Sequence, residues 1–213
     1  MSILSQKTLK NQIIISGVGL HTGKPVELKL LPSTPNTGII FKRTDLRKNN
    51  IIIPSYENVI DTTLCTTLSN SNGAKVSTIE HLMGALYGLG IDNLLIEVNS
   101  QELPILDGSA KIFIEKILSV GIETSSSPIK LIKIEKKVSY QEGSKSISLD
   151  RSKVSSEIDF EIRYKNQNIG IQRNKINIFN DELKDIFESR TFCLYQDVEK
   201  LKNAGLAQGG SLK

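Results

Sequence analysis

The sequence predicts an α+β protein made of two similar two-layer α/β sandwich domains, the second of them truncated. Short β-branched or alternating apolar runs, typical of strands, are interspersed in the first half with two segments of helical periodicity. A pattern of strands and then helices begins again after a Ser-rich stretch near residue 126. We therefore predict a first domain over residues 1–125 and a second, incomplete domain over residues 126–213.

Strands dominate the beginning of the chain. They are predicted at residues 13–15, 26–30, 39–41, 51–53 and 61–68. A Gly-rich segment, Gly17–Gly23, separates the first two of them. It could cradle a phosphate, but it matches neither a P-loop nor a dinucleotide-binding turn followed by a helix. We interpret it as a hairpin turn, with His21 as an ordinary turn residue.

The first helix is predicted to begin at Ser77 and to end near Gly88 and Gly90. Ser77 and Glu80 have the spacing of a capping box. At about 100° per residue, His81 lies opposite the apolar face, with Gly84 and Gly88 beside it. Glycines leave open space above His81, so a ligand or a metal ion can approach it. A strand over residues 91–98 and a helix over residues 110–120 follow.

The second half begins after the predicted linker, residues 123–128, which is rich in Ser. Strands are predicted at residues 129–138, 147–149, 158–164 and 190–194, and helices at residues 181–189 and 197–203. This pattern resembles the first half in content, although no repeat is visible at the level of single residues.

Composition restricts the class of protein. The chain has 213 residues and a net charge of +4, with 38% hydrophobic and 23% charged residues, which is typical of a globular protein. The basic residues are dispersed, so we expect no nucleic-acid partner. Cys65 and Cys193 are far apart and predict neither a metal cluster nor a disulfide. With no apparent signal peptide and no transmembrane segment, we expect a cytoplasmic monomer.

The Glu80-His81 dipeptide is the strongest indication of chemistry in the chain. An imidazole can bind a metal ion while an adjacent carboxylate moves protons, as metal hydrolases require. Helix capping alone would also explain Glu80. The residues themselves leave both interpretations open.

Seven short segments, taken together, carry a resemblance to a known family. They are Gly17–Gly23, Asp61–Thr66, Ser77–His81, Gly90–Asn93, Glu102–Ser109, Arg190–Phe192 and Gly209–Ser211. In this order and at these spacings, the chain resembles the UDP-3-O-acyl-N-acetylglucosamine deacetylases of lipid A biosynthesis, from about residue 12 to its last residue.

The resemblance implies a zinc (Zn²⁺) hydrolase of Gram-negative bacteria. Such an enzyme removes the 2-N-acetyl group of UDP-3-O-(3-hydroxyacyl)-N-acetylglucosamine, releasing acetate. His81 matches a zinc ligand, Glu80 the general base, and Thr191 the hydroxyl that stabilises the oxyanion. The positions matched to substrate binding, including the passage for the acyl chain, are Leu64, Cys65, Phe192, Val198, Ala207, Gly210 and Ser211.

The family pattern also contains residues that this chain lacks. Two further zinc ligands come from a His-Lys-x-x-Asp helix, and a later histidine is the general acid. The only other histidine here, His21, matches the Gly-rich segment instead. We therefore expect the 213-residue chain to be inactive by itself. The alternative is a catalytically inactive remnant, or a module that binds the sugar nucleotide and the acyl chain.

Overall fold

The computed structural model describes residues 5–152, 156–178 and 180–210. Its helices and strands confirm the α+β class. Contacts divide the chain into two compact units, one of Met1–Ile129 with Asp185–Lys213 and the other of Lys130–Lys184. The division into two similar domains near residue 125 remains a prediction. Within the described residues, no helix is long and apolar enough to cross a membrane.

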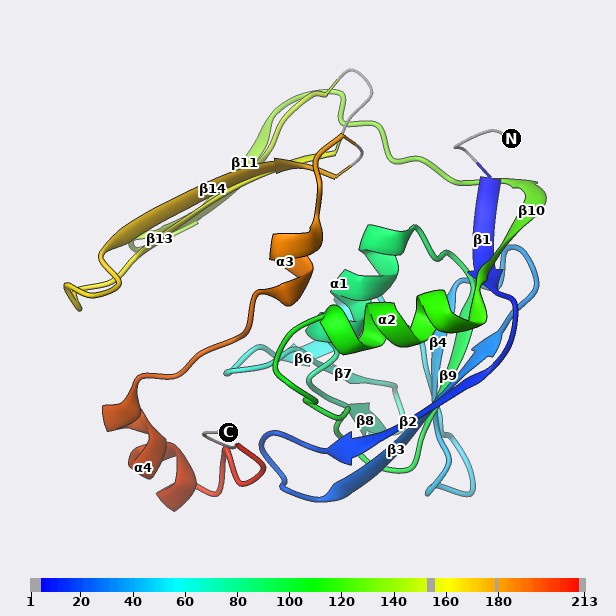
Figure 1. The fold of residues 1–213 in the computed structure, drawn as a ribbon, viewed down its shortest axis with the longest axis horizontal. Helices are drawn as coiled ribbons and strands as arrows, with labels where there is room; N and C mark the ends of the chain where they lie inside the picture. The colour runs from blue at the N-terminus through cyan, green and yellow to red at the C-terminus, as the bar shows by residue number, and fades with distance from the viewer. Residues whose placement is uncertain (1–4, 153–155, 179, 211–213) are drawn as a thin grey trace. The chain divides into compact units, whose positions relative to one another are not determined.

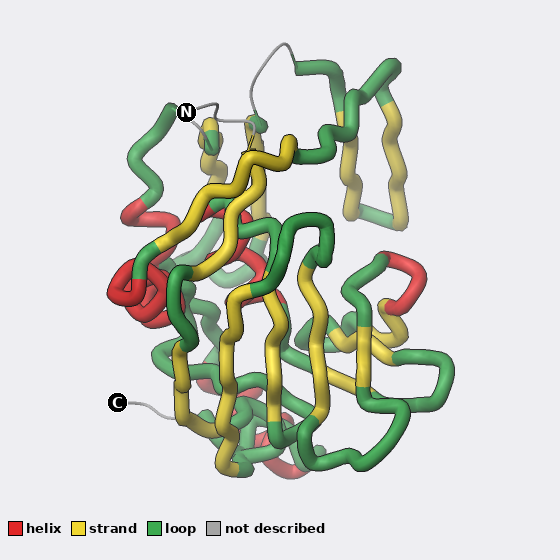
Figure 2. Tube along the Cα trace, turned by 90° about the vertical axis from the view of Figure 1, so that its right-hand side faces the viewer, coloured by secondary structure: helices red, strands yellow, loops and turns green. Residues whose placement is uncertain are grey.

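The first unit is built on a five-stranded mixed sheet with the order β2-β3-β9-β4-β5. Four of these strands, β2, β3, β4 and β9, are labelled in Figure 1, and Figure 2 shows the strands of the chain in yellow. These strands are β2 (Ile13–Val18), β3 (Pro25–Pro32), β4 (Ile39–Arg43), β5 (Ile51–Ile52) and β9 (Leu94–Val98). All neighbours are antiparallel except β4 and β9. The five strands predicted in these regions of the sequence are confirmed.

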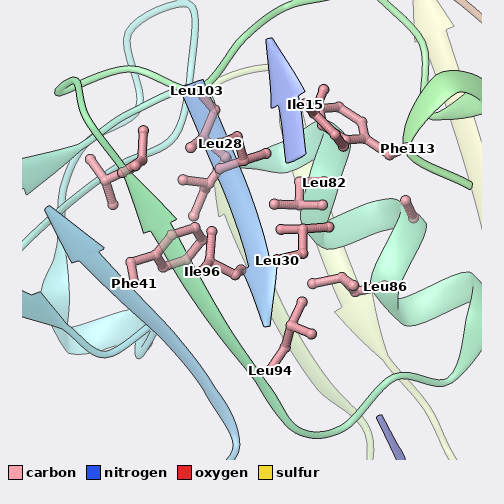
Figure 3. Close-up of a cluster of buried hydrophobic side chains, with 14 of the residues drawn as sticks. Ile15, Leu28, Leu30, Phe41, Leu82, Leu86, Leu94, Ile96, Leu103 and Phe113 are labelled. Carbon is pink, nitrogen blue, oxygen red and sulfur yellow. The ribbon is translucent and has the colours of Figure 1, made fainter. Parts of the chain in front are cut away.

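Two helices, α1 (Glu80–Leu89) and α2 (Lys111–Val120), pack against this sheet (Figure 1). Leu82 and Leu86 of α1 are fully buried and face Leu30 of β3 (Figure 3). Burying one such side chain contributes about 1.5–3 kcal/mol. The apolar face predicted for the first helix is therefore the face that holds α1 to the sheet.

Smaller elements complete the first unit. A three-stranded antiparallel sheet contains β6 (Val59–Asp61), β7 (Thr67–Ser69) and β8 (Lys75–Val76), and β1 (Ser5–Leu9) pairs with β10 (Ile122–Pro128). The 3₁₀ helix η1 (Tyr56–Asn58) precedes β6. Helix α4 (Tyr195–Asn203) also belongs to this unit. Helix α3 (Lys184–Glu188) begins one residue before Asp185, where the second segment of the unit starts. Both helices overlap predicted ones, although α3 is shorter than expected.

Two strand predictions of the first unit are wrong. The strand predicted over residues 61–68 is two strands, β6 and β7, separated by a turn. Asp61 Oδ1 accepts a hydrogen bond from the Thr63 N–H (2.8 Å), and Leu64 has a φ of 61°, so the chain cannot remain extended there. Residues 190–194 form no strand.

The predicted linker, residues 123–128, is wrong as well, because it lies in strand β10. Leu9 faces Ile122 and Lys7 faces Thr124 across the β1–β10 ladder. The ladder satisfies the backbone of a Ser-rich segment that has few apolar side chains. Pairing with a distant strand therefore decided the structure here, and the local composition did not.

The second unit consists of two antiparallel hairpins. They pair β11 (Val138–Glu142) with β12 (Lys145–Leu149), and β13 (Glu157–Arg163) with β14 (Ile171–Asn177). The strands predicted at residues 147–149 and 158–164 are confirmed. The strand predicted at residues 129–138 is wrong, because residues 129–137 form no strand and β11 begins at Val138. The sequence pattern does not predict β14, whose residues are mostly polar.

Candidate active site

The chain turns sharply immediately before α1. Ser77 lies in an isolated bridge, where its N–H donates to the Gln101 carbonyl (2.9 Å) and its carbonyl accepts from the Leu103 N–H (3.0 Å). Thr78 then adopts a left-handed φ of 57°. The N-cap is Ile79, without a capping side chain, so the predicted capping box is wrong. Ser77 cannot cap the helix because the bridge holds it away from the first turn, and its hydroxyl donates to Gln101.

Glu80 is instead held from the side by the turn between β6 and β7. Its Oε2 accepts a hydrogen bond from the Thr66 N–H at 3.0 Å. The same turn carries Leu64, which has a left-handed φ of 61° and is largely exposed, and the partly buried Cys65. The left-handed backbone of Leu64 is consistent with a functional site, where strained non-glycine residues are concentrated. Because this turn also holds Glu80, the predicted base lies close to two of the predicted substrate positions, Leu64 and Cys65.

His81 follows Glu80 in the first turn of α1 and is partly buried. Burial lowers the pKa of its imidazole below the usual range, while the carboxylates of Glu80 and then Asp107 oppose that shift. A lowered pKa keeps the ring neutral near pH 7, which is the form that binds metal ions. No local sequence pattern indicates that Asp107, 26 residues after His81, acts on its imidazole.

The surface of α1 on the His81 side is only partly open. A Cβ added at Gly84 would meet no atom within 4 Å, so the predicted space is confirmed there. A Cβ added at Gly88 would lie 2.6 Å from Cε1 of the Phe187 ring. The prediction of open space is therefore wrong at Gly88, because Phe187 occupies it.

Thr191 is positioned by a turn that precedes α2. Its N–H donates to the Gly108 carbonyl at 2.8 Å, and Gly108 has a left-handed φ of 80°. The neighbouring Asp107 accepts hydrogen bonds from the Ser109 hydroxyl (2.8 Å) and N–H, and its Oδ2 lies 3.7 Å from Nε of Arg190. Asp107 thus lies next to the Thr191 segment and also acts electrostatically on His81. Asp107 does not cap α2, whose N-cap residue is Ala110.

The remaining substrate positions lie after Thr191. Phe192 is largely exposed, Val198 is a partly buried residue of α4, and Ala207 has a left-handed φ of 52°. Beyond α4 the chain docks on the Gly17–Gly23 turn, where the Gly209 N–H donates to the Leu20 carbonyl (2.9 Å). Gly210 is exposed, and Ser211 lies outside the described residues.

A buried carboxylate, Glu102, supports that turn, and sequence reasoning assigned it no role. It is fully buried and accepts hydrogen bonds from the N–H groups of His21 and Thr22 (both 2.8 Å) and from the Thr78 hydroxyl (3.0 Å).

The hairpin turn predicted at Gly17–Gly23 is confirmed. Its histidine is less ordinary than expected, because both ring nitrogens of His21 are buried without a partner among the described residues.

The described part of the chain does not by itself make up a metal site. It contains no group of three or more His, Cys, Asp or Glu side chains that could hold an ion. A catalytic zinc site usually needs about three protein ligands. Among the described residues, the site brings together one imidazole, His81, and the carboxylates of Glu80 and Asp107, which act on it electrostatically.

Comparison with known proteins identifies close relatives. The family model of the UDP-3-O-acyl N-acetylglycosamine deacetylases matches residues 6–213. The chain is 42% identical over 216 residues to the UDP-3-O-acyl-N-acetylglucosamine deacetylase of Haemophilus ducreyi and 42% identical over 214 residues to that of Pasteurella multocida. Each match covers 99% of this chain and 70% of the relative.

Proposed function

The chain belongs to the family of UDP-3-O-acyl N-acetylglycosamine deacetylases, and we propose that it serves the deacetylation of UDP-3-O-acyl-N-acetylglucosamine in lipid A biosynthesis. The reaction hydrolyses the 2-N-acetyl amide and releases acetate. We propose zinc as the cofactor and the cytoplasm as the location. The observation that carries the proposal is the Glu80-His81 pair at the start of α1, with Glu80 oriented by the Thr66 N–H.

Each residue of the pair has a separate role in this proposal. His81 would supply one neutral imidazole ligand to a zinc ion, which when bound lowers the pKa of its water and polarises a carbonyl. Glu80 would take a proton from the attacking water. The hydrogen bond from Thr66 engages Oε2, and the other oxygen, Oε1, can accept that proton.

Thr191 would stabilise negative charge on the amide oxygen by donating a hydrogen bond from its hydroxyl. Thr191 is exposed, and the hydrogen bond from its N–H to the Gly108 carbonyl, which holds its backbone, supports this proposal. A preorganised donor of this kind contributes about 10²–10³ in rate. Leu64, Cys65 and Phe192 would contact the substrate, and Val198, Ala207, Gly210 and Ser211 would line the passage for the acyl chain.

A second candidate function is a binding module without activity. The incomplete donor set among the described residues favours it for the 213-residue chain alone. Such a module would bind the sugar nucleotide and the acyl chain but retain little zinc. We propose that the isolated chain behaves in this way, and that it contributes the base and one ligand when the rest of a family member is supplied.

The test compares two proteins. One is the 213-residue chain, and the other is a chimera in which it replaces the matched 70% of the Haemophilus ducreyi relative. We expect zinc retention and acetate release from UDP-3-O-acyl-N-acetylglucosamine in the chimera only. A folded chimera that binds zinc but releases no acetate would contradict the proposed function. Full activity of the isolated chain would exclude the binding module.

A further inference from the structure

Thr191 lies at the end of a short segment, residues 187–191, that crosses the beginning of α2; we name it the strap. Two backbone hydrogen bonds hold it, from the Ala110 N–H to the Phe187 carbonyl (3.1 Å) and from the Thr191 N–H to the Gly108 carbonyl (2.8 Å). Both hydrogen bonds lie at the N-terminal end of α2, so the strap runs beside the turn that carries Asp107.

Side-chain ion pairs add little to this attachment. Lys111 Nζ lies 3.0 Å from Glu188, and Arg190 Nε lies 3.7 Å from Asp107. Three of these four side chains are more than a third exposed, and exposed pairs contribute only about 0–1 kcal/mol. They cannot hold the strap in one position by themselves.

Phe187 is the only apolar residue of the strap, and it packs against the core of the first unit. Its ring lies on Gly88 of α1, where a Cβ would come within 2.6 Å of Cε1 and 2.7 Å of Cζ. Contacts that short do not occur between real side chains, so the ring can lie there only because residue 88 is glycine. Glycine inside a helix costs about 1 kcal/mol of stability relative to alanine. The contact with the Phe187 ring explains why a glycine stands at position 88 despite that cost.

Gly88 also lies on the same side of α1 as His81, two turns farther along the helix. The helix that presents His81 therefore holds the anchor of the strap that presents Thr191. We propose that the contact between Phe187 and Gly88 is a positioning device that fixes Thr191 relative to His81. The role of Thr191 itself rests on the proposed function, whereas the mechanical link does not.

The link can be tested by amide hydrogen exchange in the 213-residue chain, followed by NMR. Gly88→Ala forces the ring away, so the Thr191 N–H should exchange about tenfold faster or more, while amides of the central sheet such as Leu94 remain unchanged. Gly84→Ala is the matched control, because it adds the same methyl group to the same helix in open space. An unchanged Thr191 exchange rate in Gly88→Ala would overturn the proposal.

Two further variants distinguish the loss of the contact between Phe187 and Gly88 from a general folding defect. Phe187→Ala removes the anchor without introducing a clash, and it should also accelerate exchange at Thr191. Phe187→Leu combined with Gly88→Ala removes the tip of the ring that the new methyl group meets, and it should slow the exchange again. A double variant that exchanges as fast as Gly88→Ala would contradict the role of the ring.

Kinetics in the chimera then separate the strap from the proposed function. Gly88→Ala should lower kcat with little change in KM, because Thr191 acts on the transition state. Faster exchange in a chimera whose unsubstituted form releases no acetate would sustain the link and contradict only the function. Faster exchange with an unchanged kcat would show that the strap does not position a catalytic group.

Discussion

The two compact units differ sharply in how they use the same kind of strand. In the first unit the alternating residues of β3 are buried between neighbouring elements, and Leu28 and Leu30 are fully inaccessible. In the second unit, none of the described residues among 130–184 is buried, although Tyr140 and Ile147 also face each other across a hairpin. A two-stranded hairpin has no core of its own. Alternation therefore predicts strands, and only packing layers make them stable.

The largest contrast is expected from shortening one apolar side chain in each unit. Leu82→Ala removes a fully buried side chain of α1 and should cost about 2–5 kcal/mol. Ile147→Ala, at a position that is 66% exposed, should change stability by about 0.5 kcal/mol or less. Urea unfolding of both variants measures the difference. Equal losses would show that the β11–β12 hairpin is packed in solution.

A smaller loss is expected at the buried carboxylate of the first unit. Glu102→Gln keeps the size of the side chain but removes a charge that accepts from His21, Thr22 and Thr78. Hydrogen bonds to charged groups contribute about 1.5–3 kcal/mol, so a loss of that order should appear in urea unfolding. Glu97→Gln, in a partly exposed pair with Lys42, is the control and should cost less than about 1 kcal/mol.

The pH dependence of stability should reveal the partly buried His81. Its pKa is lower in the folded chain than the usual value of about 6.5 in the unfolded chain. Below that pH the unfolded chain binds a proton that the folded chain resists, so unfolding becomes more favourable as the pH falls toward the lowered pKa. Urea midpoints between about pH 5 and 7.5 should fall less steeply in His81→Gln. A steeper fall in His81→Gln would mean that folding raises the pKa of His81 instead of lowering it.

The smallest effect is a gain. Gly84→Ala places a methyl group in open space on α1 and removes the conformational freedom of glycine. We expect a stabilisation of up to about 1 kcal/mol, measured as a higher urea midpoint. A loss at this position would mean that the space above Gly84 is occupied.

The sequence predicted local structure well where apolar residues repeat with one period. The strands of the central sheet and the apolar face of α1 are of this kind. It failed at Ser77, at residues 123–128 and at Gly88, where a partner far along the chain decides the outcome. The Gln101 carbonyl accepts a hydrogen bond from the Ser77 hydroxyl, and β1 pairs with the Ser-rich segment. The ring of Phe187 fills the space at Gly88.

The site was predictable to a similar extent. Adjacency in the sequence was enough to single out Glu80 and His81. The Thr66 N–H that holds Glu80 and the Asp107 carboxylate that acts on His81 come from other elements, so no local pattern could indicate them. The roles of Glu80, His81 and Thr191 and of the substrate positions remain predictions.

We propose Glu80 as the general base and His81 as a zinc ligand of a deacetylase. These roles are tested by the rate of acetate release by the chimera carrying Glu80→Gln, with the zinc content measured in the same sample. We predict full zinc content with a rate reduced about 10²–10⁴-fold, as expected for the loss of a general base. A rate close to that of the unsubstituted chimera, at equal zinc content, would contradict the role of Glu80 as the base.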